Sequence, residues 1–320
     1  MIFSVEYLER LSDATGFQLG SLEKQMHLLH VLREIRRHPY LKDQFALKGG
    51  TAINIFLQSM PRLSVDIDLN YVGAKDVDDM LAARPEIDQA LEQLVEDIGF
   101  SVDYKPPPTS HAGGKWILVA DSALGDIFTL ELDINFAYRI PLGDIQYLKP
   151  YDIDEEYTVP FPIVSTRELY AGKILALLNR GAVRDLYDTQ RALVNGILEV
   201  NNPLKYTLLF LGLAQPVDWR QVTPQKLQEI TAKQIDVELT PMLTQDDPFD
   251  LETAQSAVTP FLEALLDYSE DERECIDLFL TQGEFRPELL LDDQEEIQRF
   301  RNHPAILWRL QKLRQYHGIQ

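Results

Sequence analysis

The sequence is poor in cysteine and in long hydrophobic runs. Its 320 residues include one cysteine, Cys275, which excludes intramolecular disulfides and zinc sites built from several thiolates. The longest apolar stretch, around residues 208–214, is far shorter than the ~20 residues that span a bilayer. The first residues, MIFSVEYLERLSD, contain no basic segment followed by an apolar run, so no signal peptide is expected. We therefore expect a soluble, cytoplasmic protein that has no membrane contact.

Basic residues are also scarce. The 30 Lys and Arg residues face 51 Asp and Glu residues, a formal net charge of −21, which argues against a protein that coats nucleic acid. Residues 215–296 hold 21 acidic and 5 basic residues, whereas residues 297–320 hold five basic residues and no acidic one. These segments are either solvated helix faces, or surfaces that meet a basic partner and a polyanion respectively.

Length and pattern indicate two lobes. Hydrophobic residues make up 45% and charged residues 25% of the chain, as in ordinary globular proteins. The pattern changes from mixed helix and strand to helix alone near residues 160–165. The sequence therefore predicts an α+β N-terminal lobe with a mixed sheet, residues 1–164, and an all-helical C-terminal lobe, residues 165–320. No role is predicted for the segment after residue 200.

Individual elements follow from periodicity. The opening forty residues have helical spacing, and residues 63–69 alternate as a strand does. Residues 76–98 favour a helix that breaks at Pro85, because proline removes a helical hydrogen bond. Further strands are predicted at residues 100–104, 116–120 and 128–136, and the glycines and prolines of residues 106–114 indicate a loop.

The most informative residues are carboxylates on predicted strands. Alternation puts Asp66 and Asp68 on one face of a strand whose other face is apolar. Their repulsion must be offset, either by solvent at an exposed edge or by a divalent cation. A third carboxylate, Asp133 or Glu131, could join them from the apolar–acidic strand at residues 128–136. Three converging carboxylates form an oxygen site suited to Mg²⁺.

A glycine-containing turn precedes these carboxylates. Lys48, Gly49, Gly50 and Thr51 lie where a predicted strand becomes a helix, and glycines there let backbone N–H groups approach phosphates. Arg62 and Ser64 come just before Asp66 and could contact phosphate oxygens. Together these residues suit a nucleoside triphosphate with its metal, and so phosphoryl or nucleotidyl transfer. The sequence has no Gly-x-x-x-x-Gly-Lys-Ser/Thr segment and no Gly-x-Ser-x-Gly segment, which excludes P-loop and hydrolase-elbow sites.

Four segments carry a resemblance to a known family. LKGGTAINIF, RLSVDIDLNYV, ELYAGKILALLNR and RDLYD, which span roughly residues 45–190, resemble the AbiEii/AbiGii-type toxins. These toxins are the nucleotidyltransferase halves of type IV toxin–antitoxin systems and part of the polymerase-beta-like nucleotidyltransferase superfamily. The pairing of Arg-x-Ser-x-Asp-x-Asp with Arg-Asp-x-x-Asp is the most specific part of the match.

The resemblance implies a role for each matching residue. Asp66 and Asp68 would hold Mg²⁺ or Mn²⁺, with Asp133 preferred over Glu131 as the third acid. Lys173 would reach the phosphates and Asp185 would be an essential acid, so the C-terminal lobe, residues 165–320, would contribute to the active site. The implied nucleotide- and phosphate-binding residues are Lys48, Gly49, Gly50, Thr51, Arg62, Ser64, Arg184 and Asp188.

The resemblance also implies a substrate and partners. A nucleoside monophosphate would pass from a nucleoside triphosphate to RNA, at the 3′ end of transfer RNA, with growth arrest and abortive infection of phage-infected cells as the result. A cognate antitoxin would be the protein partner. The alternatives are a protein hydroxyl as acceptor, or a catalytically weak nucleotide-binding module that acts through protein contacts.

Some of these residues have plainer interpretations. Asp-x-Asp also occurs on solvated strand faces, Lys173 could be an exposed helix lysine, and Asp185 with Asp188 could form ion pairs on a helix surface. His27 and His30 share a helical face but lack a third ligand, which favours a core or surface pair over a metal site.

Overall fold

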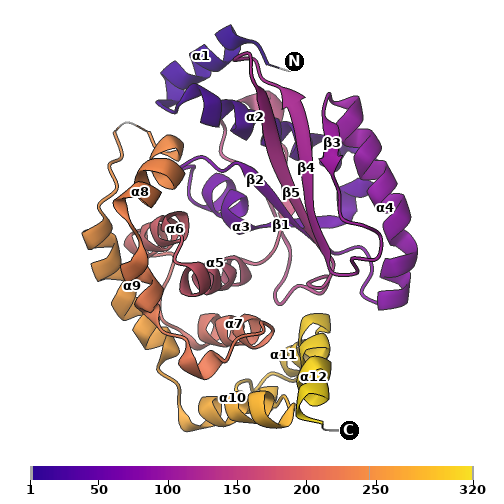
Figure 1. Cartoon of the computed structure of the whole chain (residues 1–320), viewed down its shortest axis with the longest axis vertical. Coiled ribbons are helices and arrows are strands. Elements are labelled where there is room, and N and C mark those ends of the chain that lie inside the picture. Colours follow the sequence, from indigo (N-terminus) through magenta and orange to yellow (C-terminus); the bar gives the residue numbers. More distant parts are fainter. Residues whose placement is uncertain (1–2, 245, 319–320) are drawn as a thin grey trace. The chain divides into compact units, whose positions relative to one another are not determined.

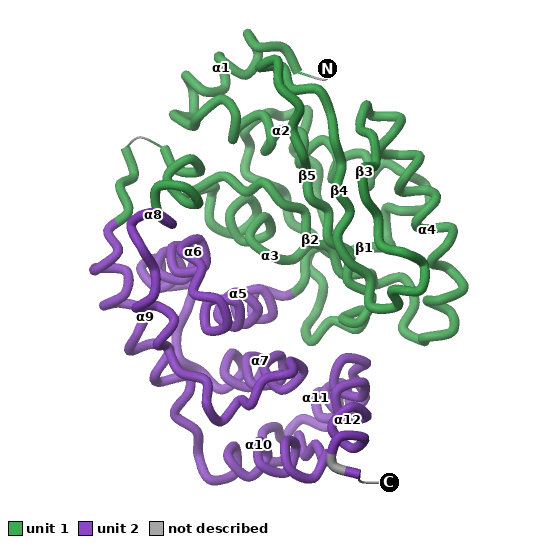
Figure 2. Tube along the Cα trace, viewed as in Figure 1, with its two compact units in different colours: residues 1–164, 235–249 green, residues 165–234, 250–320 purple. Residues whose placement is uncertain are grey.

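The computed structural model describes residues 3–244 and 246–318, in two compact units (Figure 2). The first unit contains residues 1–164 and 235–249, and the second contains residues 165–234 and 250–320. Residues 235–249 thus belong with the first unit, although they come from the part of the sequence expected to form the helical lobe.

A mixed sheet forms the centre of the first unit. Within the described residues it has seven strands in the order β3-β4-β5-β2-β1-β7-β6, of which Figure 1 labels β1 to β5. The pairs β2–β5 and β1–β7 are parallel, and the other neighbours are antiparallel. This sheet and the helical second unit confirm the predicted fold class. The strands are β1 (Phe45–Lys48), β2 (Asp66–Tyr71), β3 (Ser101–Tyr104), β4 (Gly113–Asp121), β5 (Ile127–Asn135), β6 (Gln146–Leu148) and β7 (Phe161–Ile163).

One face of the sheet is apolar and packs against helix α2 (Leu19–Arg37). Alternate residues of β4, β5 and β2 on this face, such as Leu118, Leu132 and Ile67, are fully buried. The buried carboxylate of Glu23 joins the helix to the β4–β5 turn. It accepts one hydrogen bond from the Ser122 hydroxyl (2.6 Å) and one from the Ala123 N–H (2.6 Å). The polar residues of the same strands therefore lie on the opposite face.

Helix boundaries differ from the prediction at two points. The opening helical segment is two helices, α1 (Val5–Thr15) and α2, because Gly16 adopts a left-handed conformation (φ 76°) that ends the first. The break predicted at Pro85 is wrong: α4 (Val77–Asp97) continues through it. Proline removes one helical hydrogen bond there, but residues on both sides, including Met80 and Ile87, are buried, which keeps the helix whole.

Strand boundaries are displaced too. The strand predicted from residue 63 begins at Asp66, and residues 58–65 form a loop with left-handed backbone at Ser59 (φ 54°) and Met60 (φ 57°). The strand predicted from residue 116 begins at Gly113, inside the segment predicted to be loop. The α3 (Gly49–Thr51) turn continues as the π-helix η2 (Ala52–Leu57) before the loop.

The segment 235–249 closes the loop that precedes β2. The Met242 carbonyl accepts a hydrogen bond from the Leu63 N–H (2.9 Å), and the Pro241 carbonyl accepts one from the Ser21 hydroxyl (2.7 Å). Beneath them Leu63 and Met60 pack in a small buried cluster with residues of the N-terminal helices. The approach to Asp66 is therefore held by a part of the chain about 180 residues away.

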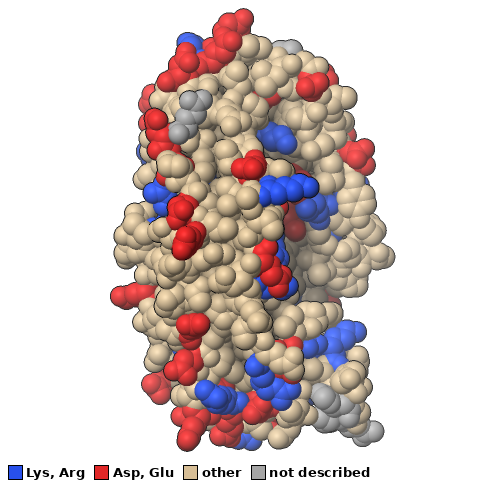
Figure 3. Space-filling model, turned by 60° about the vertical axis from the view of Figure 1, so that its left-hand side comes forward, with Lys and Arg blue, Asp and Glu red and all other residues tan. Residues whose placement is uncertain are grey.

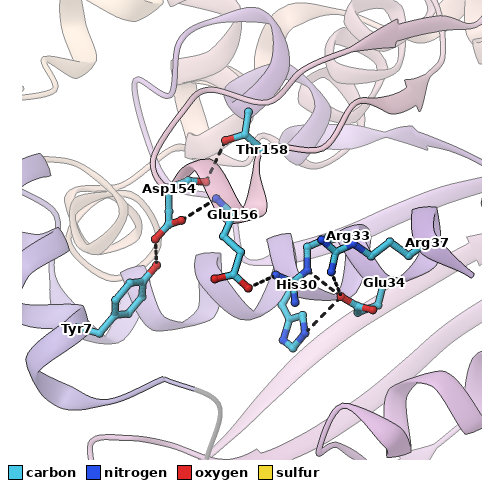
Figure 4. A network of polar contacts seen from close by, with 8 residues as sticks. All are labelled: Tyr7, His30, Arg33, Glu34, Arg37, Asp154, Glu156 and Thr158. Carbon is cyan, nitrogen blue, oxygen red and sulfur yellow. Dashed lines mark hydrogen bonds and ion pairs between the residues drawn. The ribbon is translucent and has the colours of Figure 1, made fainter.

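A polar network fastens the N-terminal helices to the segment around η3 (Glu155–Tyr157), as Figure 4 shows. The Tyr7 hydroxyl donates to Asp154 (2.6 Å), and the Arg33 guanidinium donates to Glu156 (2.6 Å) and to Glu34 (2.7 Å). The Arg33 guanidinium also lies 4.4 Å from the centre of the buried Tyr157 ring. These contacts fix the first helices within the first unit.

Helices make up the second unit. Helix α7 (Asn202–Leu213) packs closely on a buried tryptophan, since a Cβ on Gly212 would lie 2.5 Å from the Trp219 ring. The Trp219 indole N–H donates to the Tyr268 hydroxyl (2.7 Å). In the described parts of both units no helix is long and apolar enough to cross a bilayer. The longer helices are α5 (Thr166–Arg180), α6 (Val183–Val194), α7 (Asn202–Leu213), α9 (Leu251–Leu266), α10 (Glu270–Gln282), α11 (Gln294–Arg301) and α12 (Pro304–His317).

His27 lies in the core of the first unit. Its ring packs edge-on against Phe100 and close to Phe128, and neither ring nitrogen has a hydrogen-bond partner among the described residues. The nearest carboxylate is Glu23, at 4.0 Å. Burial, with a smaller contribution from His30, lowers the pKa of His27 to about 3. His27 and His30 are both buried, so they form a core pair, one of the two arrangements favoured from the sequence.

Acidification should therefore destabilise the first unit through His27. The unfolded chain takes up a proton on this ring below its ordinary pKa of ~6.5, whereas the folded protein takes it up only near pH 3. The free energy of unfolding should fall by up to about 1.4 kcal/mol per pH unit within that window. We expect His27→Leu to reduce the pH dependence of the urea-unfolding midpoint between pH 7.5 and 4.5. His111→Leu, in an exposed loop, is the control, and equal slopes for both variants would contradict the assignment.

Candidate active site

The glycine turn after β1 lies against Asp68. Gly49 has a left-handed backbone (φ 74°), and a Cβ built on it would lie 2.1 Å from the Asp68 carboxylate oxygen Oδ2. Only glycine leaves room for that carboxylate. The Lys48-Gly49-Gly50 segment and Asp68, singled out separately in the sequence, thus form one local structure.

The sheet places four charged residues in one row across four strands. Lys48 of β1 is opposite Asp68 of β2, Asp68 is beside Asp133 of β5, and Asp133 is opposite Lys115 of β4. Residues at the same register in neighbouring strands have side chains on the same face. The order along the row is therefore Lys48, Asp68, Asp133, Lys115.

A second pair of carboxylates lies two residues further along the same two strands. Asp66 of β2 is beside Glu131 of β5. Both candidates for the third acid thus lie on the same face as Asp66 and Asp68, with Asp133 next to Asp68 and Glu131 next to Asp66. Together the row and this second pair hold four carboxylates and two ammonium groups, a formal charge of −2.

Lys115 is the residue that the sequence analysis missed. Its ammonium group forms an ion pair with Glu131, and the side chain is 48% exposed. The hydrogen bond to Glu131, with attraction from Asp66 and Asp133, raises the pKa of Lys115, although burial opposes the shift. The glycines before it indicated a loop, so the sequence carried no sign that Lys115 is within a strand.

Buried hydroxyl groups hold the start of β2. The Thr51 hydroxyl donates to the Asp66 carbonyl (2.5 Å) and lies 2.8 Å from the Ser64 hydroxyl. The Ser64 N–H donates to the Gln25 side chain of α2 (2.9 Å). Arg62 is also buried and donates to the Leu63 carbonyl (2.7 Å). In this structure these predicted phosphate-binding residues fix the backbone from which Asp66 and Asp68 project.

The remaining predicted residues form a separate cluster within the second unit. The Lys173 ammonium of α5 binds Asp185 (2.8 Å) and Asp188 (2.9 Å) of α6. Arg180 also binds Asp185 (2.8 Å). Lys173 is 7% exposed and Asp185 2%, so neither the exposed lysine nor the surface ion pair suggested by the simpler interpretation is present. Arg184, in the first turn of α6, is partly buried.

The cluster keeps its charges despite burial. Burial raises the pKa of Asp185, but the attraction of Lys173 and Arg180 outweighs it and holds the pKa below its ordinary value. An ionised carboxylate in this setting depends on its cationic partners, since an unpaired buried charge is strongly unfavourable.

Removing Lys173 should therefore destabilise the second unit. We expect Lys173→Met to lower the free energy of unfolding by about 3–5 kcal/mol, because it leaves two buried aspartates with less compensation. The control is Lys226→Met, which breaks the exposed pair with Glu229 and should cost about 1 kcal/mol or less. Urea unfolding followed by circular dichroism checks both. Equal midpoints for the two variants would show that the buried cluster contributes little.

Comparison with known proteins extends these observations. The sequence profile of the nucleotidyl transferase AbiEii toxins of type IV toxin–antitoxin systems matches residues 30–311. Among solved structures, the fold is similar to that of MenT4, a nucleotidyltransferase toxin from Mycobacterium tuberculosis H37Rv. The TM-score is 0.61 and the identity 16%, over 95% of this chain and 99% of that one. No curated protein matches the sequence.

The MenT4 comparison shows the fold alone, whereas the profile covers most of this chain and so shows the family. It confirms the resemblance that the four motifs carry, and it implies an antitoxin as partner. The chain belongs to the AbiEii family of toxins from type IV toxin–antitoxin systems and is a nucleotidyltransferase.

Proposed function

We propose that the face bearing Asp66, Asp68 and Asp133 binds a nucleoside triphosphate with a divalent cation, and that the enzyme transfers the nucleoside monophosphate to RNA. The observation that carries this proposal is the charged row itself, with the Asp68 carboxylate set against Gly49. Like charges on neighbouring strands are unfavourable unless a ligand or counter-ion offsets them. A nucleotidyltransferase has such a ligand in its metal-bound substrate.

The donor set fits Mg²⁺ or Mn²⁺. Asp66, Asp68 and Asp133 offer hard oxygen ligands on adjacent strands. Among the described residues no three His, Cys, Asp or Glu side chains are grouped closely enough to hold a metal ion by themselves. Magnesium sites in nucleotide-using enzymes typically take one or two carboxylates and complete their coordination with substrate phosphates and water. When bound there, the cation would neutralise the phosphates and lower the pKa of the acceptor hydroxyl.

The proposed reaction is an in-line displacement at the α-phosphorus. The acceptor hydroxyl oxygen forms a bond to that phosphorus, the bond to the bridging oxygen of the β-phosphate breaks, pyrophosphate leaves and the hydroxyl proton passes to solvent. Lys48 and the N–H groups of Gly49 and Gly50 would bind phosphate oxygens. Thr51, Ser64 and Arg62 would keep β2 in place, which fixes the reacting geometry.

The second unit would contribute Lys173, a compact positive charge suited to phosphate. Asp185 and Asp188 would position its ammonium group, to which both now bind, with Arg184 beside them in α6.

Basic and aromatic residues near the end of the chain support RNA as the acceptor. The side chain of Trp308 on α12 is 57% exposed, and the Lys312 ammonium lies 5.8 Å from its ring centre. Exposed aromatic rings beside cations suit unpaired nucleotides, such as the 3′ end of transfer RNA. Acidic side chains are spread over the face shown in Figure 3, with basic side chains between them, so RNA would need a locally cationic surface.

The biological setting follows from the family. We propose that transfer to transfer RNA in the cytoplasm arrests growth, that this arrest serves abortive infection, and that the cognate antitoxin prevents it. Two findings would replace this proposal: transfer to a protein hydroxyl, or nucleotide binding without turnover.

The direct test uses total transfer RNA, Mg²⁺ and each of the four α-³²P-labelled nucleoside triphosphates. We expect label on the RNA from wild-type enzyme and essentially none from Asp66→Ala or Asp68→Ala, because each loses a metal-binding carboxylate. Asp103→Ala, at an exposed position of β3, should retain wild-type labelling. Label on protein alone would move the acceptor to a polypeptide, and bound triphosphate without label would favour the binding module.

Gly49→Ala tests the contact beneath Asp68. The added Cβ displaces the Asp68 carboxylate, and a misplacement of about 1 Å lowers turnover about 100-fold in comparable sites. Gly125→Ala is a matched control, because Gly125 also has positive φ (94°) in the first unit but nothing within 4 Å of its Cβ position. Similar initial rates for the two variants would contradict a role for this contact.

A further inference from the structure

The position of Lys115 depends on Gly113, two residues before it. Gly113 has positive φ (97°), and a Cβ on it would lie 1.9 Å from the Ile134 carbonyl oxygen, so β4 begins in close contact with β5. The Ser110 hydroxyl donates to the Gly113 carbonyl (2.6 Å), and the Phe136 N–H donates to the Ala112 carbonyl (2.9 Å). These contacts set the register that places Lys115 opposite Asp133.

Lys115 is both charged and accessible. Its ammonium binds Glu131, and Asp66 and Asp133 attract it more weakly. About half of each side chain of the Lys115–Glu131 pair is exposed. An exposed pair of this kind contributes little to folding, so its ammonium can exchange Glu131 for another anion at small cost.

The other charges on this face indicate which anion. The centre of the row is acidic, at Asp68 and Asp133, and its two ends are Lys48 and Lys115. A triphosphate approaching four carboxylates is repelled unless cations receive its oxygens. The compact charge of a lysine is well suited to phosphate.

We propose that Lys115 binds phosphate oxygens of the triphosphate and of the pyrophosphate product, with Glu131 as the residue that positions its ammonium group until they arrive. The proposal rests on the assignment of the Asp66 and Asp68 face as the nucleotide site. It also gives the two candidate third acids different roles. Glu131 pairs with Lys115, and Asp133 would bind the cation.

The test measures binding of inorganic pyrophosphate with Mg²⁺ by calorimetry, and KM and kcat for the labelled triphosphate. Lys115→Met should weaken pyrophosphate binding and raise KM by about 10–100-fold, the usual effect of losing one hydrogen bond to a charged group, with a smaller change in kcat. Lys115→Arg should recover part of the loss. Lys105→Met, which breaks the similarly exposed pair with Glu92, should match wild type.

Metal titration distinguishes the two acids. Asp133→Asn should shift the Mg²⁺ concentration needed for half-maximal activity, whereas Glu131→Gln should leave it unchanged and raise KM a few-fold. If Lys115→Met fails to fold by circular dichroism, Lys115→Gln replaces it.

The outcomes separate this inference from the proposed site. Wild-type pyrophosphate binding and KM in a folded Lys115 variant, while Asp68→Asn abolishes activity, would overturn the role of Lys115 and leave the site intact. Wild-type activity in Asp68→Asn would show instead that the nucleotide site itself lies elsewhere.

Discussion

Four carboxylates on one face of the parallel pair β2–β5 are the constraint on which the rest of the first unit depends. Their mutual repulsion is unfavourable, and the sheet offsets part of it with one lysine at each end of the row. Two glycines in the neighbouring backbone make this arrangement of charges possible. Gly49 leaves room for the Asp68 carboxylate, and Gly113 brings β4 close enough to β5 to place Lys115.

The two units hold their charges in different ways. On the sheet face Asp66, Asp68 and Asp133 are partly exposed, so a ligand can reach them and replace their present partners. In the second unit Lys173, Asp185 and Asp188 are almost completely buried and bind one another. Buried pairs of this kind resist separation. We infer that the first cluster is arranged for ligand exchange and that the second also stabilises its own helices.

Much of this could be predicted from short-range patterns. Alternation in residues 63–69 put Asp66 and Asp68 on one face, and the glycines after Lys48 indicated a turn into a helix; both features are present. The order of the sheet could not be predicted in this way, because β2 pairs with β5 across two intervening strands in sequence. The adjacency of Asp68 and Asp133 depends on that long-range pairing.

The features that were missed have long-range causes as well. The glycines before Lys115 are typical of a loop, yet here Gly113 permits close contact between β4 and β5. The helix continues through Pro85 because of the buried residues around it. Residues 235–249 return to the first unit through contacts of Pro241 and Met242 that no local pattern indicates.

The most direct measurement of the central claim is a crystal structure with Mn²⁺ and a non-hydrolysable triphosphate, in which anomalous scattering locates the metal. The account predicts a manganese peak within coordination distance of the Asp66 and Asp68 carboxylates, with the phosphates over the charged row of the sheet. A peak coordinated by other residues, with the triphosphate bound away from this face, would contradict it.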